Sequence, residues 1–169
     1  MRILFILILV SLFKISAFGQ KEITINFTGQ INFGHKNDIT QQANISKDTI
    51  SFFKNVNHIT NDGNPTFTTI GTILIDKINS KNRIPLSKNA VCATSDHAKT
   101  LYDNGFIAIN SSNKNIGAYG FEGLASTADA LRKSSIKFAG IRSFCESTTI
   151  NHKGLKIGFA SFGNISYSP

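Results

Sequence analysis

The stretch that decides the fold is residues 105–141, which read GFIAINSSNKNIGAYGFEGLASTADALRKSSIKFAGI. An apolar run near its start predicts a buried strand over 106–112, and a periodic segment predicts a helix over 121–134. A second short strand is predicted over 136–141. Strands that alternate with helices are typical of an α/β domain with a partly parallel sheet. The sequence therefore predicts the α/β class.

The rest of the chain predicts more elements of the same kind. Alternating or β-branched residues predict strands over 23–29 and 66–75, and residues 155–163 predict a strand buried on both faces. Apolar residues at roughly helical spacing predict a helix over 47–57.

A further helix is predicted before the central stretch. Thr94 or Ser95 is expected to cap its start, and Gly105 is a natural residue to follow its end. The residues expected to face inward are Ala98, Leu101 and Tyr102.

Residues 1–19 have the layout of a secretory signal. Arg2 gives a basic start, residues 3–13 are apolar, and Ala17 and Gly19 are small, so cleavage is expected after Gly19. The apolar run is too short to span a membrane comfortably, because a spanning helix needs about 20 residues. The alternative is a retained N-terminal anchor. The main expectation is export to the periplasm, the cell envelope or the exterior, with no stable membrane span after cleavage.

The mature part, residues 20–169, is expected to be a single basic domain. Loss of Arg2 and Lys14 with the leader leaves the other 16 of the 18 basic residues against 10 acidic ones. Such a domain can meet an anionic polymer or a phosphate-type ligand, or the charge can simply keep the surface soluble. Nucleic acid is not an expected partner, since the sequence has no patch of interleaved basic and aromatic residues.

No standard catalytic motif occurs in the sequence. The nucleophile elbow, the phosphate-binding Walker loop, the zinc-protease motif and the dinucleotide fingerprint are all absent. The histidines are isolated, which favours solvated or core roles over metal binding. The cysteines are too few for a cysteine-based zinc site, although a pair in an oxidising compartment can form a disulfide. The residues alone leave the function open.

The order of segments nevertheless resembles the first half of the CapA proteins. That family is associated with poly-γ-glutamate capsule synthesis and has a calcineurin-like metallophosphoesterase fold. The similarity is carried by ITINFTGQINFG (23–34), NPTFTTIGTIL (64–74), residues 100–141 and NHKGLKIGFASFG (151–163). The resemblance implies a calcineurin-like sheet with flanking helices, here truncated, and it implies a divalent metal as the family's cofactor.

The positions that would hold the metal depart from the family pattern. Gln30 stands where the family has the Asp of a Gly-Asp pair, and residues 69–71 carry no carboxylate where it has Asn-Leu-Glu. The family's Asn-Asn-His positions fall on Asn113, Lys114 and Asn115. Amides are weak ligands and an ammonium repels cations, so no metal and no catalytic residue is expected here. These four residues, Gln30 included, are instead candidates for a ligand-binding site.

Three functions remain open on this resemblance. The first is a non-catalytic CapA-like protein that binds an anionic ligand through Lys114, Asn113 and the loop amides. The second is a metal-dependent phosphoesterase-like enzyme that a partner or a second half completes. The third is a structural or decaying fragment with an exposed sheet edge, which a protein partner could cover. The resemblance also places Cys92 and Cys145 in loops at one end of the sheet, and they are predicted to be close enough to bridge.

Overall fold

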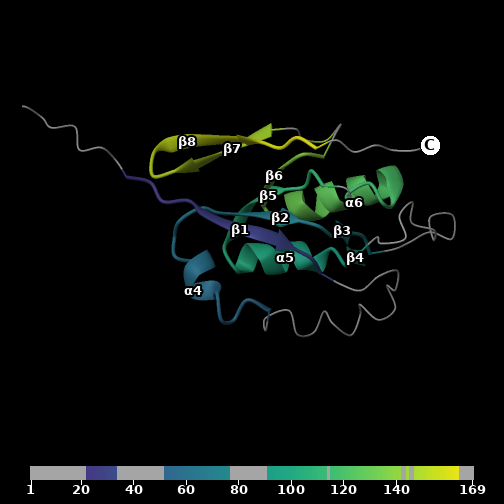
Figure 1. The fold of residues 1–169 in the computed structure, drawn as a ribbon, viewed down its shortest axis with the longest axis horizontal. Coiled ribbons are helices and arrows are strands. Elements are labelled where there is room, and N and C mark those ends of the chain that lie inside the picture. The colour runs from purple at the N-terminus through teal and green to yellow at the C-terminus, as the bar shows by residue number, and fades with distance from the viewer. Residues whose placement is uncertain are drawn as a thin grey trace, which may run out of the picture.

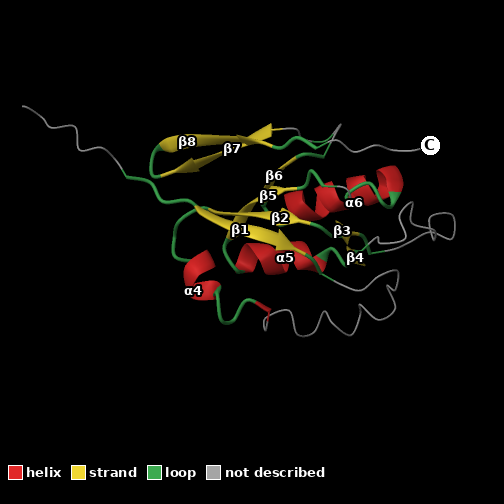
Figure 2. Cartoon of the chain, in the orientation of Figure 1, coloured by secondary structure: helices red, strands yellow, loops and turns green. Residues whose placement is uncertain are grey.

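The computed structural model describes residues 22–33, 52–76, 91–113, 115–141, 144 and 147–163. Figure 1 shows their arrangement and Figure 2 their secondary structure. In chain order the elements are β1 (Asn26–Ile31), α4 (Asn57–Thr60), β2 (Thr66–Ile70), β3 (Ile73–Leu74), β4 (Cys92–Ala93), α5 (Asp96–Asp103), β5 (Phe106–Asn110), α6 (Gly120–Lys133), β6 (Lys137–Ala139), β7 (Ser147–His152) and β8 (Leu155–Ala160).

The centre of the fold is a four-stranded sheet in the order β1-β2-β5-β6, and every neighbouring pair in it is parallel. Helices α5 and α6 lie on the connections that lead into β5 and β6. This confirms the predicted α/β class with a parallel central sheet and flanking helices. Because parallel strands all end at one edge, the loops that leave them meet there.

The two faces of the sheet are covered differently. Helices α5 and α6 pack on one face, and the antiparallel hairpin of β7 and β8 lies on the other (Figure 1). A register shift in β5 changes which face of the sheet its side chains occupy. Phe106 and Ala108 pair with consecutive residues of β2, and Ile107 between them has no partner there. Phe106 accordingly belongs to the helix-side core, whereas Ala108 belongs to the hairpin side.

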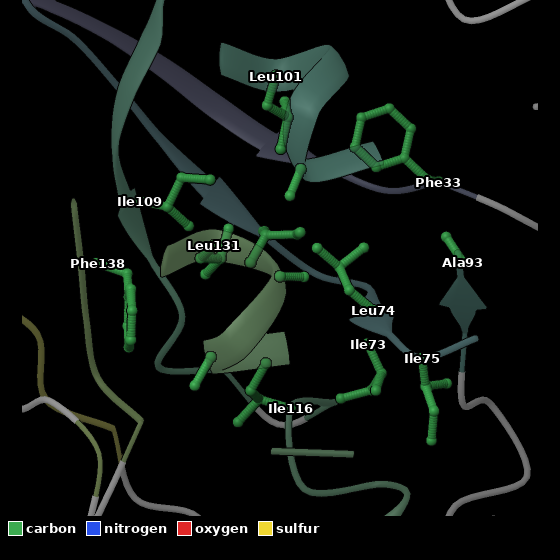
Figure 3. Close-up of a cluster of buried hydrophobic side chains, with 14 of the residues drawn as sticks. Phe33, Ile73, Leu74, Ile75, Ala93, Leu101, Ile109, Ile116, Leu131 and Phe138 are labelled. Carbon is green, nitrogen blue, oxygen red and sulfur yellow. The ribbon is translucent and has the colours of Figure 1, made fainter. Parts of the chain in front are cut away.

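The helix-side core is the larger of the two. Phe106, Ile109, Leu101 and Leu131 are almost fully buried there, and Figure 3 shows the last three converging between the sheet and the helices. Each such side chain stabilises the fold by roughly 1.5–3 kcal/mol relative to an exposed position. The predicted apolar face of the 121–134 helix is confirmed, since Leu124, Ala128 and Leu131 are all buried in α6.

The start and end of α5 follow the sequence prediction with one difference. Ser95 is the N-cap residue, but its side chain does not cap the helix. Its backbone N–H and its hydroxyl donate instead to the two carboxylate oxygens of Asp76, each at 2.7 Å. Gly105 follows the helix with φ +88°, as predicted for a residue at this position. Tyr102 was predicted to face inward and is exposed.

Three predicted elements are wrong in extent. The strand predicted over 66–75 breaks at Gly71, and its second half pairs with β4 in a separate sheet. The strand predicted to end at Gly29 continues to Ile31, with a register shift between Phe27 and Gln30. Part of the helix predicted over 47–57 lies outside the described residues, and over 53–56 the chain forms turns before α4 begins.

The C-terminal strand is also different from the prediction. Residues 155–163 were expected to form a central strand buried on both faces, but β8 is a largely exposed strand that pairs antiparallel with β7. Strand β7 was not predicted at all. The turn between them is at Lys153 and Gly154. No helix among the described residues is long and apolar enough to cross a membrane.

Candidate functional site

The candidate site lies where the parallel strands of the central sheet end. Gln30 is near the end of β1, Gly71 follows β2, Asn113 and Asn115 follow β5, and Gly140 follows β6. In parallel α/β sheets this edge is the usual place for ligands. Three of the four residues predicted as a site therefore lie at the same edge. Lys114, the fourth, lies outside the described residues.

Gln30 and Asn32 form the first wall of the site. The Gln30 Nε2 donates to Asn32 Oδ1 at 2.9 Å, and both side chains are exposed. They lie directly against the backbone of Gly71, where a Cβ would approach the Gln30 Cδ to 2.7 Å. A glycine at the end of β2 is what lets these two amides close over the strand.

Asn113 and Asn115 form the second wall. Asn113 Nδ2 donates to the Ile70 carbonyl at 2.5 Å, and Asn115 Nδ2 lies 3.4 Å from the Gly71 carbonyl. The Asn115 N–H in turn donates to Asn113 Oδ1 at 2.9 Å. These bonds tie the β5 loop to the end of β2, more than forty residues away in the chain. They satisfy carbonyls that the strand pairing leaves open.

Asn110 and Ser161 link the site to the hairpin side. Asn110 Nδ2 donates to Thr69 Oγ1 at 3.2 Å, while its Oδ1 accepts from the Ser112 N–H at 2.8 Å. The Ser161 hydroxyl also donates to Asn110 Oδ1. Asn110 therefore joins β2, the β5 loop and the end of β8. Asn110, Ser112 and Ser161 were not predicted as site residues, and only the polar ending of the IAINSS stretch hints at the first two.

The donors that the described residues bring to the site are neutral. The side chains that meet there are amides and hydroxyls, and most of their donors are already bonded to backbone carbonyls or to one another. In the part of the chain that the structure describes, no three His, Cys, Asp or Glu side chains gather as a metal site. Divalent ions of hydrolases are held by carboxylates and imidazoles. The described donors do not fit a pair of such ions.

Cys92 was predicted to lie in a loop, but it lies buried in β4, next to the start of α6. Its sulfur accepts a hydrogen bond from the Tyr119 hydroxyl at 3.3 Å. Burial, together with this bond, raises the pKa of Tyr119. Cys145 lies outside the described residues, so its predicted bridge to Cys92 stays a prediction.

Most of the chain matches a known protein family. The model of the family described as "Bacterial capsule synthesis protein PGA_cap" matches residues 24–168. The chain belongs to the PGA_cap family. The predicted resemblance to the CapA proteins is thereby confirmed, and every described residue of the site lies within the PGA_cap match. No curated protein sequence matches the chain significantly.

The PGA_cap match makes the composition of the site informative. The parallel sheet, the β5 loop and α6 are all present. The positions that the resemblance assigns to metal ligands carry Gln30, Asn113 and Asn115, and their side chains hold neighbouring segments together. In this PGA_cap chain the edge of the sheet is thus fastened by amides.

Removal of the Asn113 side chain tests this fastening role. We expect Asn113→Ala to lower the free energy of unfolding by about 1–3 kcal/mol, because the carbonyl oxygen of the buried residue Ile70 loses a hydrogen-bond donor. Asn115→Ala is the matched control from the same loop. Its longer contact with Gly71 predicts a loss below about 1 kcal/mol. Urea unfolding of both variants measures the difference, and equal losses would contradict the assigned roles.

His97 is a buried titratable group outside the site. It is 1% exposed, its ring packs against Phe33, and its Nδ1 lies 3.2 Å from the carbonyl and the hydroxyl of Thr94. Its Nε2 is buried with no hydrogen-bond partner among the described residues. Burial lowers the pKa of His97, against the opposing effects of the Thr94 contact and the Asp96 carboxylate. His97 is thus a core histidine, as the isolated pattern predicts.

The lowered pKa of His97 predicts a pH-dependent stability. The folded state favours the neutral ring of His97. Its contribution to the free energy of unfolding is therefore fully present above the ordinary histidine pKa of about 6.5. It is lost progressively as the pH falls from there towards the lower pKa of the folded state. We expect His97→Asn to flatten the fall in unfolding free energy below that pH. An unaltered slope in His97→Asn would contradict this.

Proposed function

We propose that this chain is an exported capsule-synthesis-type protein that does not catalyse metal-dependent hydrolysis and that binds an anionic ligand at the sheet edge. The observation that carries the proposal is the chemistry of that edge. Its described side chains are amides and hydroxyls, in a family to which the chain plainly belongs. Membership supplies the capsule context, and the donor set argues against metal chemistry.

The anionic ligand is supported by the charge of the chain. Without residues 1–19 the chain has 16 basic and 10 acidic residues, a formal net charge of +6, and Lys114 stands between Asn113 and Asn115. Among the described residues at the edge, no carboxylate competes for a cation or repels an anion. Proteins commonly hold carboxylates and phosphates with amide N–H groups and lysine side chains. A carboxylate or phosphate group is therefore the ligand chemistry that we assign.

Titration of the ¹⁵N-labelled full chain tests the ligand. Inorganic phosphate and tri-γ-glutamate are the two probes, and the amide signals of residues 113–115 are followed by NMR. We expect saturable shifts there at millimolar concentrations of one probe. Lys114→Gln should weaken the binding about threefold to tenfold, in line with the loss of one charge-assisted bond. The absence of shifts at Asn113–Asn115 would overturn the ligand assignment.

Export is supported by the layout of residues 1–19. Expression of the full chain with its leader in a bacterial host, followed by intact-mass measurement of the fractionated product, tests it. We expect the exported fraction to contain a protein whose mass corresponds to a chain that begins at Gln20. Full-length protein that stays with the membrane would favour the retained anchor.

A protein completed by a partner is the second candidate, and the open sheet edges favour it. Within the described part of the chain, β1 pairs only with β2, and β8 pairs only with β7. Exposed strand edges of this kind accept further strands. If the partner supplied metal ligands, a phosphodiester assay with manganese or zinc would show activity only with both chains present. Activity of the single chain would contradict both candidates.

A further inference from the structure

An apolar groove runs between the edge of the central sheet and the hairpin. Its volume is about 460 Å³, and residues of β1, β2 and β8 line it together with Asn110 and the segment that follows β8. Its aromatic floor is a chain of ring contacts. Phe67 lies between Phe27, at 5.2 Å between centroids, and Phe159, at 5.3 Å. None of the described residues that line the groove is charged.

One wall of the groove is the edge of β8 rather than one of its faces. Six consecutive residues, 157–162, line the groove, although successive side chains of a strand point to opposite faces. Consecutive lining residues mean that the backbone edge of the strand borders the space. The opposite edge of β8 is already paired with β7.

The hairpin register identifies the backbone groups on this open edge. Lys153 and Gly154 have φ of 48° and 80°, which is the two-residue turn typical of tight hairpins. Such a turn makes His152 and Leu155 a hydrogen-bonded pair, and the pairs then alternate along the ladder. Lys156, Gly158 and Ala160 therefore direct their N–H and C=O groups away from β7. All three residues are exposed, and two of them are small enough for another backbone to approach.

We propose that this groove binds an extended polypeptide segment of another protein, which adds to β8 as a further strand. Main-chain hydrogen bonds to Gly158 and Ala160 hold the segment. Every second side chain of the segment is apolar and packs on the ring floor of the groove, next to the exposed Phe27 and Phe162. The inference names the partner chemistry of the second candidate function, and it rests on that candidate.

Charge selects the occupant. The hairpin, residues 147–160, carries Lys153 and Lys156 and no acidic residue. A second copy of this chain would bring two basic hairpins together on molecules that each carry 16 basic and 10 acidic residues, a net charge of +6, without the leader. A segment whose apolar stretch is flanked by Asp or Glu is complementary. A glycan could stack on the rings, but it would leave the alternating N–H and C=O groups of the edge without matched partners.

Selection from a displayed library of random twelve-residue peptides tests the proposal, with the full chain as the target. The enriched peptides are expected to have apolar residues at alternate positions and acidic flanks. A synthetic peptide of the enriched sequence should bind Ala160→Pro at least about tenfold more weakly, because proline removes an outward N–H and blocks strand addition. Ala160→Ser keeps that N–H and should bind within about twofold of the unchanged chain.

The Phe162 ring offers a second position at which peptide binding can be tested. Phe162→Ala removes a ring that is 86% exposed, so it should weaken peptide binding without unfolding the chain. No enrichment, binding that Ala160→Pro leaves unchanged, binding of glycans only, or a dimer formed through β8 would each overturn the proposal. The phosphate and tri-γ-glutamate shifts at 113–115 should persist in Phe162→Ala. Their loss with intact peptide binding would count against the anion site alone.

Discussion

Gly105→Ala is expected to destabilise the chain by about 3–5 kcal/mol, which is a large part of the stability of an ordinary domain. Two causes act together. The backbone has φ +88°, a conformation that side chains rarely adopt. A Cβ there would also meet the backbone at the end of α4, with the Thr60 carbonyl carbon at 2.7 Å. Because the obstacle is backbone, no side-chain rotation relieves it.

Gly63→Ala is the matched control for this prediction. Gly63 has nearly the same conformation, with φ +86°, but nothing lies within 4 Å of the position of its Cβ. It should cost only the conformational part, about 1–2 kcal/mol. Urea unfolding of the two variants separates the clash from the backbone strain. If both variants lost the same free energy of unfolding, Gly105 could not lie as close to the Thr60 backbone as the structure places it.

Gly140→Ala is expected to have a comparable effect on stability, about 3 kcal/mol or more, and to disturb the candidate site as well. Gly140 ends β6 with φ +94°. A Cβ there would lie 2.6 Å from the Ser112 Cβ, 2.6 Å from the Ser161 Oγ and 2.7 Å from the Ser112 nitrogen. The β5 loop and the end of β8 would have to separate, and their shared partner Asn110 would lose both contacts.

Gly120→Ala is the control for the site. Gly120 is the first residue of α6, at the far end of the loop that contains Ser112; it has φ +62° and nothing within 4 Å of a Cβ. We expect it to cost about 1–2 kcal/mol and to leave the NMR signals of Ser112 and Ser161 in place. Gly140→Ala should move both signals. Unmoved signals in a folded Gly140→Ala chain would contradict the packing of β6 against these serines.

The sequence predicts those parts of the fold that local patterns determine. The apolar run of β5 and the periodic face of α6 are strong local signals, because burial selects residues at fixed spacing. Gly105 is predictable for a similar reason, since a left-handed residue at a helix end favours glycine. The break at Gly71 is not, because TFTTIGTILI is β-branched on both sides of it. The structure shows that the side chains of Gln30 and Asn32 lie over this glycine and that the chain beyond it pairs with β4.

The hairpin and the site depend on long-range contacts. One face of β8 packs on Phe67, but the open face carries Gly158 and Ala160 instead of polar side chains, so its run of residues resembles a buried strand. The bond from Ser161 to Asn110 joins residues 51 apart, and that from Asn113 to Ile70 joins residues 43 apart. No local pattern carries such pairs. The resemblance to CapA located Gln30, Asn113 and Asn115, but only the structure gives their partners.

The positions that the resemblance assigns to metal ligands carry amides, on a sheet and helices of the kind that the resemblance implies. The parallel sheet and α6 position the strand ends, while Asn110 and Asn113 hold the loop to them. An amide network of this kind supplies order without the desolvation and charge balance that a metal centre needs. Ligand binding at that edge and strand addition at β8 are separate proposals, and each has its own test.

The metal content of the purified full chain tests most directly whether this amide-bearing edge holds divalent ions. The protein is dialysed against manganese and, separately, zinc, freed of unbound metal by gel filtration, and measured by mass spectrometry of the elements. We predict fewer than about one ion per ten chains, since amides and hydroxyls do not retain divalent ions through such a step. One or two ions per chain, retained together with phosphodiesterase activity, would contradict the account.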